Sequence, residues 1–466
     1  MAHLIKRHSH NKFWKNRNLE SWSAHLETLK ADLKKCLVYE DEKGLYIRPG
    51  FIPYLTQFQV EVENFIEYPT PRKFPWKAPL PFELHPEQKL TCRLFPEERH
   101  ANASLTTAFG KSAIILNTCR EMGLNTVIVV PSKSIFEELL EKFEHHFGKK
   151  YVGCFGDGKK KLDKKFTIAI GDSLANIKEG TPEHEFFSRQ QVMIVDESHE
   201  FAAESLEAVC HGVLSEIPYR FFLSATQIRN DGSGPLLQSI IGRTVCTLTT
   251  EQAVKKGYIC PHDFKIVCVE SSNPTFEDSD ALAMKREHFL KNTNIASFIA
   301  KLVNSAAAQG KGTLVLVSEL SQIAMLTPLI KVPFAIAHSE KRKDRLAALG
   351  VEKVDSRESI EKFNRGEVSG LAGTSCIATG TNMYPCHYVA NWVGGSSPIK
   401  TKQGAVGRGV RWGKSNPWAA KCAPKEHCTI FDFDIEDNFV MSRHLEIRIG
   451  CYMESGPGLI KYVRLK

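Results

Sequence analysis

The sequence predicts an α/β protein built around two parallel sheets. From about residue 82, short apolar runs alternate with amphipathic stretches, and a second series of the same kind follows Thr250. Strands that alternate with helical segments are typical of parallel sheets covered by helices. The chain of 466 residues is also longer than the roughly 100–200 residues of one ordinary domain. We therefore expect two consecutive α/β lobes after a small N-terminal α+β domain.

The first series has four expected strands that are short, apolar and rich in branched residues: Thr126–Val130, Thr167–Ile170, Val192–Val195 and Phe221–Leu223. Between them, Ile135–Phe147 has apolar residues at helical spacing. Asp157-Gly158 predicts a hairpin, and Lys159, Lys160 and Lys161 beside it are expected in a solvated turn, with a phosphate contact as the alternative.

The second series continues this pattern with six expected strands: Phe264–Val269, Thr313–Val317, Phe334–Ile336, Leu371–Ala372, Tyr388–Trp392 and Thr429–Phe433. Helical spacing of apolar residues is found near 284–308, 319–330 and 355–365. The expected domains are therefore an N-terminal domain at 1–80, lobes at 81–250 and 251–440, and a C-terminal tail at 441–466.

The N-terminal region differs from both series. Leu45–Phe51 is expected to be a strand that runs into a turn, and the five prolines from Pro69 to Pro81 predict a linker. The first residues are basic, as is the whole chain, which has a net charge of +8. This charge favours a polyanionic partner without requiring one.

Composition also restricts where in the cell the protein is expected to be. The chain has no apolar run near the ~18 residues that span a membrane, and its basic N-terminus lacks the apolar segment of a secretory signal. Its 13 cysteines are scattered, which favours reduced thiols. We therefore expect a cytoplasmic protein, in the host cytoplasm if the chain is of phage origin.

Gly110-Lys111-Ser112 precedes the helical run Ala113–Arg120. A phosphate loop requires backbone N–H groups at a helix N-terminus and a lysine that reaches the outer phosphates. The full G-x-x-x-x-G-K-[ST] pattern is not met at its first position, where Leu105 replaces glycine.

Asp196-Glu197 follows the apolar run Val192–Val195. A carboxylate at the carboxyl end of a strand faces the crevice where an open α/β sheet binds ligands. Asp196 is expected to hold Mg²⁺, partly through water, and Glu197 to orient and deprotonate the attacking water. The alternative is an acidic helix N-terminus stabilised by the helix dipole.

Gln403, Gly407, Arg408 and Arg411 form a Q-x-x-G-R-x-x-R segment in the second series. Arginines that reach a nucleotide from another lobe stabilise charge on a transferring phosphoryl group. A basic surface patch would not require the glutamine and the glycine at fixed offsets.

These three segments, in this order and with Ser224-Ala225-Thr226 between them, resemble superfamily 2 DExH helicases over residues 82–435. The resemblance implies two tandem RecA-like lobes, ATP and Mg²⁺ as cofactors, and ATP hydrolysis coupled to lobe closure. In the family pattern, Gln88 reads the adenine, and the loop contacts the nucleotide through Thr107, Ala108, Phe109, Gly110, Lys111 and Ser112, whose hydroxyl reaches the metal. The residues with catalytic roles are Lys111, Glu197, Gln403, Arg408 and Arg411.

The resemblance also implies a nucleic-acid face and a set of coupling residues. The expected nucleic-acid contacts are Pro131, Ser132, Lys133, Gly171, Asp172, Ser173 and Thr374. The expected coupling residues between phosphate and nucleic acid are His199, Ser224, Thr226 and Gly380. Relative to the family pattern, Ala108 replaces a glycine and Asn382 an aspartate, which predicts weaker nucleotide binding and altered coupling.

Leu45–Leu55 together with a core free of large insertions is similar to phage recombination and branch-migration helicases related to eukaryotic repair translocases. That similarity implies a 3′–5′ DNA helicase that remodels forked or junction DNA in replication, recombination or repair. Two alternatives stay open: an RNA-remodelling ATPase on the same fold, and a nucleic-acid-binding protein that no longer hydrolyses ATP.

Overall fold

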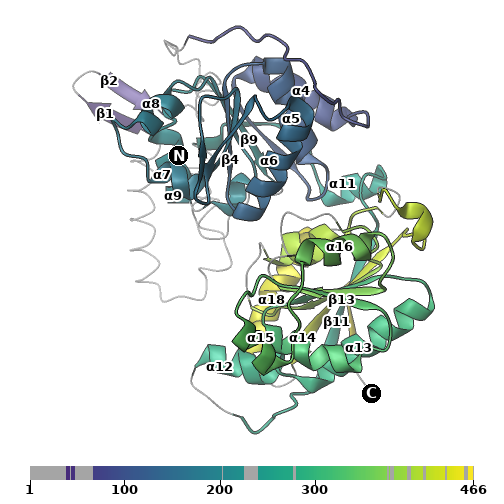
Figure 1. Ribbon diagram of the computed structural model, residues 1–466. Helices are drawn as coiled ribbons and strands as arrows, with labels where there is room; N and C mark the ends of the chain where they lie inside the picture. The colour runs from purple at the N-terminus through teal and green to yellow at the C-terminus, as the bar shows by residue number, and fades with distance from the viewer. Residues whose placement is uncertain are drawn as a thin grey trace. The chain divides into compact units, whose positions relative to one another are not determined.

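The computed structural model describes residues 38–41, 44–47, 67–201, 203–224, 240–276, 280–374, 377, 383–395, 400–412, 416–435, 438–455 and 460–464. Two compact α/β units divide between Leu248 and Thr249, with the loop residues Thr107–Phe109 grouped with the second unit. Earlier in the chain, β1 (Val38–Asp41) and β2 (Gly44–Ile47) form an antiparallel hairpin, which includes the strand expected from Leu45. The prediction of two parallel-sheet units is confirmed (Figure 1).

The first unit is an eight-stranded sheet in the order β10-β3-β9-β8-β4-β7-β5-β6. Its strands are parallel except for β6, which pairs antiparallel with β5 across the predicted Asp157-Gly158 turn. The strands are β3 (His100–Leu105), β4 (Thr126–Val130), β5 (Val152–Gly156), β6 (Lys159–Lys161), β7 (Phe166–Ile170), β8 (Val192–Val195), β9 (Tyr219–Ser224) and β10 (Arg243–Leu248).

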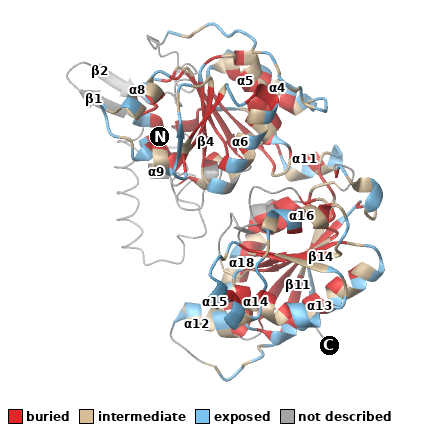
Figure 2. Cartoon of the chain, in the orientation of Figure 1, coloured by how far each residue is buried: buried red, intermediate tan, exposed pale blue. Residues whose placement is uncertain are grey.

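Helices cover both faces of this sheet, as parallel strands require. Figure 1 shows α4, α5 and α6 on one side of β4, and α7, α8 and α9 on the other. Their bounds are α4 (Pro86–Glu98), α5 (Lys111–Met122), α6 (Lys133–Phe147), α7 (Gly171–Ala175), α8 (Pro182–Ser188) and α9 (Ala203–His211). The central strands β4, β8 and β9 are buried along their whole length, which explains their continuous apolar sequences (Figure 2).

The second unit is a seven-stranded, fully parallel sheet in the order β13-β14-β12-β15-β16-β11-β17. Its strands are β11 (His262–Val269), β12 (Thr313–Val317), β13 (Phe334–Ala337), β14 (Gly370–Gly373), β15 (Tyr388–Trp392), β16 (Cys428–Ile435) and β17 (Ile460–Arg464). Its helices are α11 (Thr250–Lys255), α12 (Ala281–Lys285), α13 (Thr293–Ala308), α14 (Leu320–Leu326), α15 (Lys343–Leu349), α16 (Ser356–Asn364), α17 (Gly407–Gly409) and α18 (Phe439–Glu454). Short π-helical and 3₁₀ turns lie at Arg286–Leu290, Thr327–Leu329, Lys400–Val406 and Ala419–Lys421.

Residues 441–466, expected as a tail, instead contribute to the second unit. Strand β17 pairs with β11, and α18 is tied to the sheet by a buried ion pair. Arg448 donates to the two carboxylate oxygens of Asp432 at 2.7 and 3.0 Å, and the Tyr452 hydroxyl donates to the same carboxylate at 2.5 Å. The sequence of this region has one short strand after a helix of mixed polarity, so its pattern alone did not predict membership of the sheet.

The proline-rich segment, expected as a linker, packs against the first unit. Its backbone donates to the ends of α5 and α6, through Phe74 to Arg120 and through Lys77 to His146. The ring of Phe74 contacts Phe147, Tyr151 and Phe166, and the ring of Trp76 stacks on Phe147 at 4.9 Å. We call residues 67–81 the strap.

Two truncations test the strap. Removing residues 1–66 is expected to leave the stability of the first unit unchanged, whereas removing 1–80 takes away Phe74 and Trp76. Loss of two aromatic side chains from an apolar contact lowers the free energy of unfolding by about 3 kcal/mol or more. Urea unfolding of both truncations checks this, with Phe74→Ala/Trp76→Ala in the full chain as the matched control. Equal stability of the two truncations would show that the strap does not hold the first unit.

Within the described ranges, no helix is both long enough and apolar enough to cross a membrane.

Candidate active site

The carboxyl edge of the first sheet collects most of the residues that the sequence singled out. Strand β4 pairs parallel with β7 and with β8, and β8 pairs parallel with β9. The carboxyl ends of all four strands therefore lie along one edge of the sheet. Ligands bind at this edge in open α/β sheets. The predicted residues that follow or end these strands are Pro131, Ser132 and Lys133 after β4, Gly171, Asp172 and Ser173 after β7, Asp196 and Glu197 after β8, and Ser224 at the end of β9.

The phosphate loop runs from the end of β3 to the start of α5. Leu105 is the last residue of β3 and is fully buried, so the position where the usual pattern has glycine lies inside the sheet here. Gly110 caps α5 at a φ of 83°, which glycine adopts without strain. Ala108 has a φ of 66°, and a left-handed alanine costs roughly 1 kcal/mol. The loop therefore keeps its conformation with alanine, at a cost in stability.

Gln88 lies against this loop although it is 22 residues away in sequence. It sits in the first turn of α4, where its Oε1 accepts from the backbone N–H of His85 at 2.8 Å. Its Nε2 donates to the carbonyl oxygen of Gly110 at 3.4 Å. This places a buried amide beside the start of α5, consistent with a residue that contacts a bound nucleotide.

Lys111 and Glu197 form a buried ion pair at the centre of the site. The Lys111 Nζ lies 2.9 Å from Glu197 Oε1, and the two side chains are 8% and 13% exposed. Glu197 has a φ of 50°, an uncommon backbone conformation for a glutamate, which is typical of residues held in place for function. The pair joins the start of α5 to the residues after β8, so two segments that the sequence singled out are in contact.

Two more carboxylates surround this pair. Burial raises the pKa of Asp196 to about 7, with Glu197 adding to the rise and Lys111 opposing it. Burial likewise raises the pKa of Glu200 to about 8, and Glu197 and Asp196 add to it. Three carboxyl groups thus lie around one lysine, so the site has a deficit of positive charge when all three are ionised.

This deficit, together with the oxygen donors present, fits Mg²⁺. The Ser112 hydroxyl lies at the start of α5, and Asp196 directly follows β8, so a hydroxyl and a carboxylate are available. Mg²⁺ is usually held by one or two carboxylates with phosphates and water rather than by a cage of protein ligands. Accordingly, no group of three or more His, Cys, Asp or Glu side chains in the described part of the chain could hold a metal ion.

Lys142 and Glu138, both on α6, also reach the site, and the sequence analysis did not single them out. Lys142 Nζ donates to Ser112 Oγ at 3.1 Å and to Glu138 Oε1 at 2.5 Å. Glu138 also contributes to the raised pKa of Asp196. Their spacing of four residues on an amphipathic helix reads as an ordinary surface pair, so only the fold shows that they face the phosphate loop. Glu200 was missed for a related reason, since it follows the acidic pair within a 3₁₀ turn (Ser198–Glu200).

Glu200 is expected to make the stability of the metal-free protein depend on pH. Its pKa is higher in the folded than in the unfolded chain, so its stabilising contribution is present at low pH and is lost as pH rises towards about 8. Glu200→Gln should therefore be more stable than wild type at pH 8.5 and no more stable at pH 5. Urea unfolding in a chelator at both pH values checks this, with exposed Glu141→Gln as control. An equal pH dependence of stability in wild type and Glu200→Gln would show that the pKa of Glu200 is not raised in the folded protein.

The arginine segment lies in the second unit. Arg408 is within the short helix α17 and is 4% exposed, and Arg411 follows it by three residues. Thr374 directly follows β14, where its backbone N–H donates to Ala337. Glycine at 409 allows close packing, because a Cβ there would lie 2.9 Å from the Sγ of Cys428 on β16.

Some predicted site residues cannot be placed. Thr226, Gly380 and Asn382 lie outside the described residues, as do the side chains of His199 and Gln403. Their roles remain predictions.

The expected nucleic-acid contacts of the first unit have differing surroundings. Lys133 is exposed, and its Nζ lies 2.7 Å from Asp157 Oδ2 in the β5–β6 turn. This ion pair joins the turn of the predicted hairpin to the first residue of α6, close to the carboxyl end of β4. Lys160 and Lys159 pair with Glu183 and Glu137, so these lysines are occupied in surface ion pairs.

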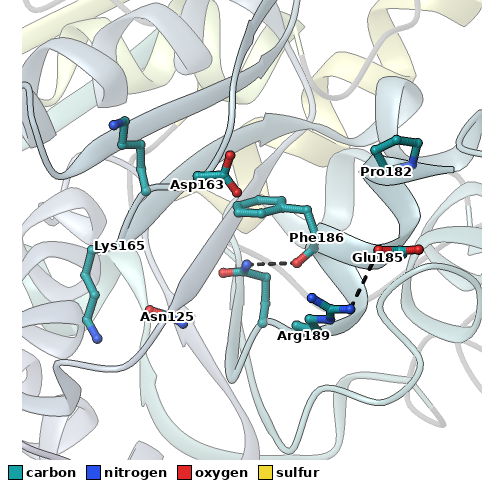
Figure 3. Close-up of a pocket in the computed structure, with 9 residues that line it drawn as sticks. Asn125, Asp163, Lys165, Pro182, Glu185, Phe186 and Arg189 are labelled. Carbon is teal, nitrogen blue, oxygen red and sulfur yellow. Dashed lines mark hydrogen bonds and ion pairs between the residues drawn. The ribbon is translucent and has the colours of Figure 1, made fainter.

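A pocket of about 450 Å³ lies at the opposite, amino edge of the first sheet. Its lining includes Asn125 and Lys165, which precede β4 and β7, and residues of or following α8. Figure 3 shows the ring of Phe186 near Asp163, and the ion pair between Glu185 and Arg189. None of the predicted site residues lines this pocket, so it is separate from the phosphate loop.

Comparisons with known proteins agree with this architecture. Residues 79–229 match the protein family described as "Type III restriction enzyme, res subunit". The DNA 3′–5′ translocase XPB2 of Sulfurisphaera tokodaii is 27% identical over 217 residues, which are 46% of this chain and 46% of the relative. The match therefore spans about half the length of that curated relative.

Two solved structures show the same fold. Mss116p bound to single-stranded RNA and AMP-PNP has a TM-score of 0.55 and 15% identity, covering 82% of this chain and 74% of that one. The ATP-dependent type ISP restriction-modification enzyme LlaBIII bound to DNA has a TM-score of 0.56 and 12% identity, covering 83% of this chain and 31% of that one.

The fold and the matches say what this chain is similar to. The chain has two RecA-like α/β units, the fold of the two solved structures. Its residues 79–229 match the restriction-enzyme subunit family, and part of the chain is similar to a DNA translocase.

Proposed function

We propose that this protein is an ATP-dependent DNA helicase or translocase that unwinds or branch-migrates forked and junction DNA in replication, recombination or repair. The observation that carries the proposal is the buried Lys111–Glu197 pair at the carboxyl edge of the first sheet, with Gln88 against the same loop. A loop lysine on the outer phosphates and a residue that positions the attacking water are two of the groups that recur in enzymes that transfer phosphoryl groups to water.

The ion pair suggests how Lys111 and Glu197 are held before nucleotide binds. While Lys111 is paired with Glu197, the glutamate is not free to accept a proton from water. Bound phosphates compete for the lysine, because they carry more negative charge than one carboxylate. Glu197 is then released to orient and deprotonate the attacking water. Mg²⁺, held by Ser112 and Asp196, would neutralise charge on the phosphates.

Glu197→Gln tests this role. The variant is expected to bind ATP with near-normal affinity and to hydrolyse it at least ~10²-fold more slowly, the usual contribution of a positioned general base. Single-turnover hydrolysis and binding of a fluorescent ATP analogue measure the two properties separately. A collapse of ATP affinity with an unchanged hydrolysis step would show that Glu197 binds rather than activates.

The arginine segment supplies the second half of the proposed mechanism. Arg408 and Arg411 are in a different α/β unit from Lys111, so they act on the nucleotide only if the units close on it. ATP would then bridge the two units, and hydrolysis would remove the bridge. DNA held by both units would be moved by this alternation, with Thr374 and the strand-end loops of the first unit as its contacts.

The choice of DNA, and a 3′–5′ direction, rest on the relative whose name states both properties. Strand displacement separates the alternatives: forked DNA, a four-way DNA junction, DNA duplexes with a 3′ or 5′ tail, and the matching RNA duplexes are each incubated with ATP and Mg²⁺. The proposal expects unwinding of forked and junction DNA and of DNA duplexes with a 3′ tail. Unwinding of RNA alone would favour the RNA-remodelling ATPase, and binding without ATP hydrolysis would favour a catalytically silent protein.

The N-terminal residues are part of the proposal, since the hairpin β1–β2 precedes the strap. The chain without residues 1–66 retains the strap and all nucleotide residues. It is expected to hydrolyse ATP at the basal rate but to unwind junction DNA less well. Full junction unwinding by this truncation would remove the N-terminal domain from the substrate grip.

A further inference from the structure

Lys425 lies in the loop between the 3₁₀ turn Ala419–Lys421 and strand β16, outside every motif of the sequence analysis. The residue is only 3% exposed, which is uncommon for a lysine unless its charge has partners. Its Nζ donates to the carbonyl oxygen of Gly409 at 2.7 Å and to that of Arg411 at 2.5 Å. Among the described residues no carboxylate pairs with it, so backbone carbonyls alone receive this buried charge.

These carbonyls belong to the arginine segment. The carbonyl between them, that of Val410, accepts from the backbone N–H of Cys260 at 2.7 Å. Trp412, the next residue, donates its indole N–H to Gly257 at 2.9 Å. Four consecutive residues, from Gly409 to Trp412, are therefore fixed by groups outside the segment.

The same segment also packs closely against strand β16. Gly409 lies so close to β16 that a Cβ would approach Cys428 Sγ to 2.9 Å and Ile430 Cδ1 to 3.3 Å. Burial raises the pKa of the nearby Cys386 thiol to about 11, and Lys425, Arg408 and Arg411 all oppose that rise. The lysine and the two arginines thus act on one small region of the second unit.

We infer that Lys425 is a positioning residue that holds the backbone after α17 so that Arg408 and Arg411 keep the orientation needed for ATP hydrolysis. Carbonyls at the end of a short helix have no partner within the helix, and one ammonium group here joins two of them across a single turn. Without the Lys425 ammonium group, the carbonyl groups of Gly409 and Arg411 lose the donor that holds the backbone between Arg408 and Arg411 in place. This inference rests on the proposed function, because it assigns Lys425 to the action of the arginines.

The test is a double-mutant cycle in the full chain with Lys425→Met, Arg408→Ala and the double variant. Methionine keeps most of the lysine's length but removes the charge and the donors. Lys425→Met is expected to lower the DNA-stimulated kcat on the order of 10²-fold, since displacement of a catalytic group by about 1 Å has such an effect. Affinity for a fluorescent ATP analogue should change less than about threefold. Exposed Lys421→Met, four residues away, is the matched control and should behave as wild type.

The cycle separates positioning from general stability. If Lys425 acts through the two arginines, Lys425→Met lowers the kcat of Arg408→Ala much less than it lowers that of wild type, because only Arg411 is left to be displaced. Two losses that multiply would show that Lys425 acts independently of Arg408 and would overturn the inference. Wild-type kcat in Lys425→Met, beside a strongly impaired Arg408→Ala, would also overturn it while leaving the proposed function in place. Normal turnover in Arg408→Ala would overturn both.

A second substitution covers the case in which Lys425→Met does not fold. Lys425→Gln removes the charge but retains an N–H donor that can reach one carbonyl. It should fold, and its kcat should lie between those of wild type and Arg408→Ala at unchanged ATP affinity. A folded Lys425→Gln with wild-type kcat would contradict the inference.

Discussion

Replacing Arg408 with alanine is expected to lower ATP turnover by roughly 10³-fold or more while most of the affinity for ATP remains. The reason is that an arginine supplied to a phosphoryl group from another structural unit acts on the transition state rather than on the bound substrate. Gln88, Lys111 and the proposed Mg²⁺ site, to which we assign most of the nucleotide affinity, are in the first unit and are not altered by the change. Steady-state hydrolysis and equilibrium binding of an ATP analogue measure the two effects.

Matched measurements make this result specific. DNA binding at low salt should persist in Arg408→Ala, because phosphate contacts are spread over many residues. Arg443→Ala, on α18, is a control for loss of an arginine elsewhere in the second unit. Normal ATP hydrolysis with lost DNA affinity would mean that Arg408 contacts the DNA backbone.

Replacing Lys111 with alanine is expected to abolish ATP turnover. In the proposed mechanism this lysine is the cation of the phosphate loop, and its Nζ lies 2.9 Å from Glu197 Oε1. The change also leaves Glu197 buried beside Asp196 and Glu200 without its cation. Removal of one partner of a buried pair costs about 3 kcal/mol, so Lys111→Ala should be less stable than wild type at neutral pH.

The double variant Lys111→Met/Glu197→Gln separates the two effects. It removes both charges of the pair, so it should regain much of the stability that Lys111→Ala loses and still not hydrolyse ATP. Urea unfolding and ATP hydrolysis are measured on the same preparations. Retained hydrolysis in Lys111→Ala would remove the phosphate-loop assignment, whatever its stability.

The sequence predicted the central strands well because they are buried on both faces and are therefore apolar throughout. Strands β4, β8 and β12 are examples, and each was placed to within a residue. Strand β3 was missed because His100–Leu105 is short of branched apolar residues, although it pairs with β9 and β10 within the sheet. The tail was misjudged because β17 forms only by pairing with β11, which is almost two hundred residues earlier.

The residues of the candidate site likewise include some that the sequence predicted and some that it did not. Lys111, Asp196 and Glu197 were predicted because their positions next to strands and helices carry chemical meaning in the sequence alone. Lys142, Glu200 and Lys425 were not, because each acquires its contacts from tertiary structure: Lys142 through Ser112, Glu200 through burial beside two acids, and Lys425 through two carbonyls. Leu105, a departure from the usual loop pattern, is explained by its place at the end of β3.

The rate of ATP hydrolysis as a function of nucleic-acid concentration tests the central claim most directly. Wild-type protein with ATP and Mg²⁺ is titrated with single-stranded DNA, four-way junction DNA and RNA, with Glu197→Gln as the background control. The account predicts a low rate without nucleic acid that rises to saturation with DNA, most steeply with the junction, and a flat response in Glu197→Gln. A rate that is the same with and without every nucleic acid would contradict the proposal that this protein couples ATP hydrolysis to DNA.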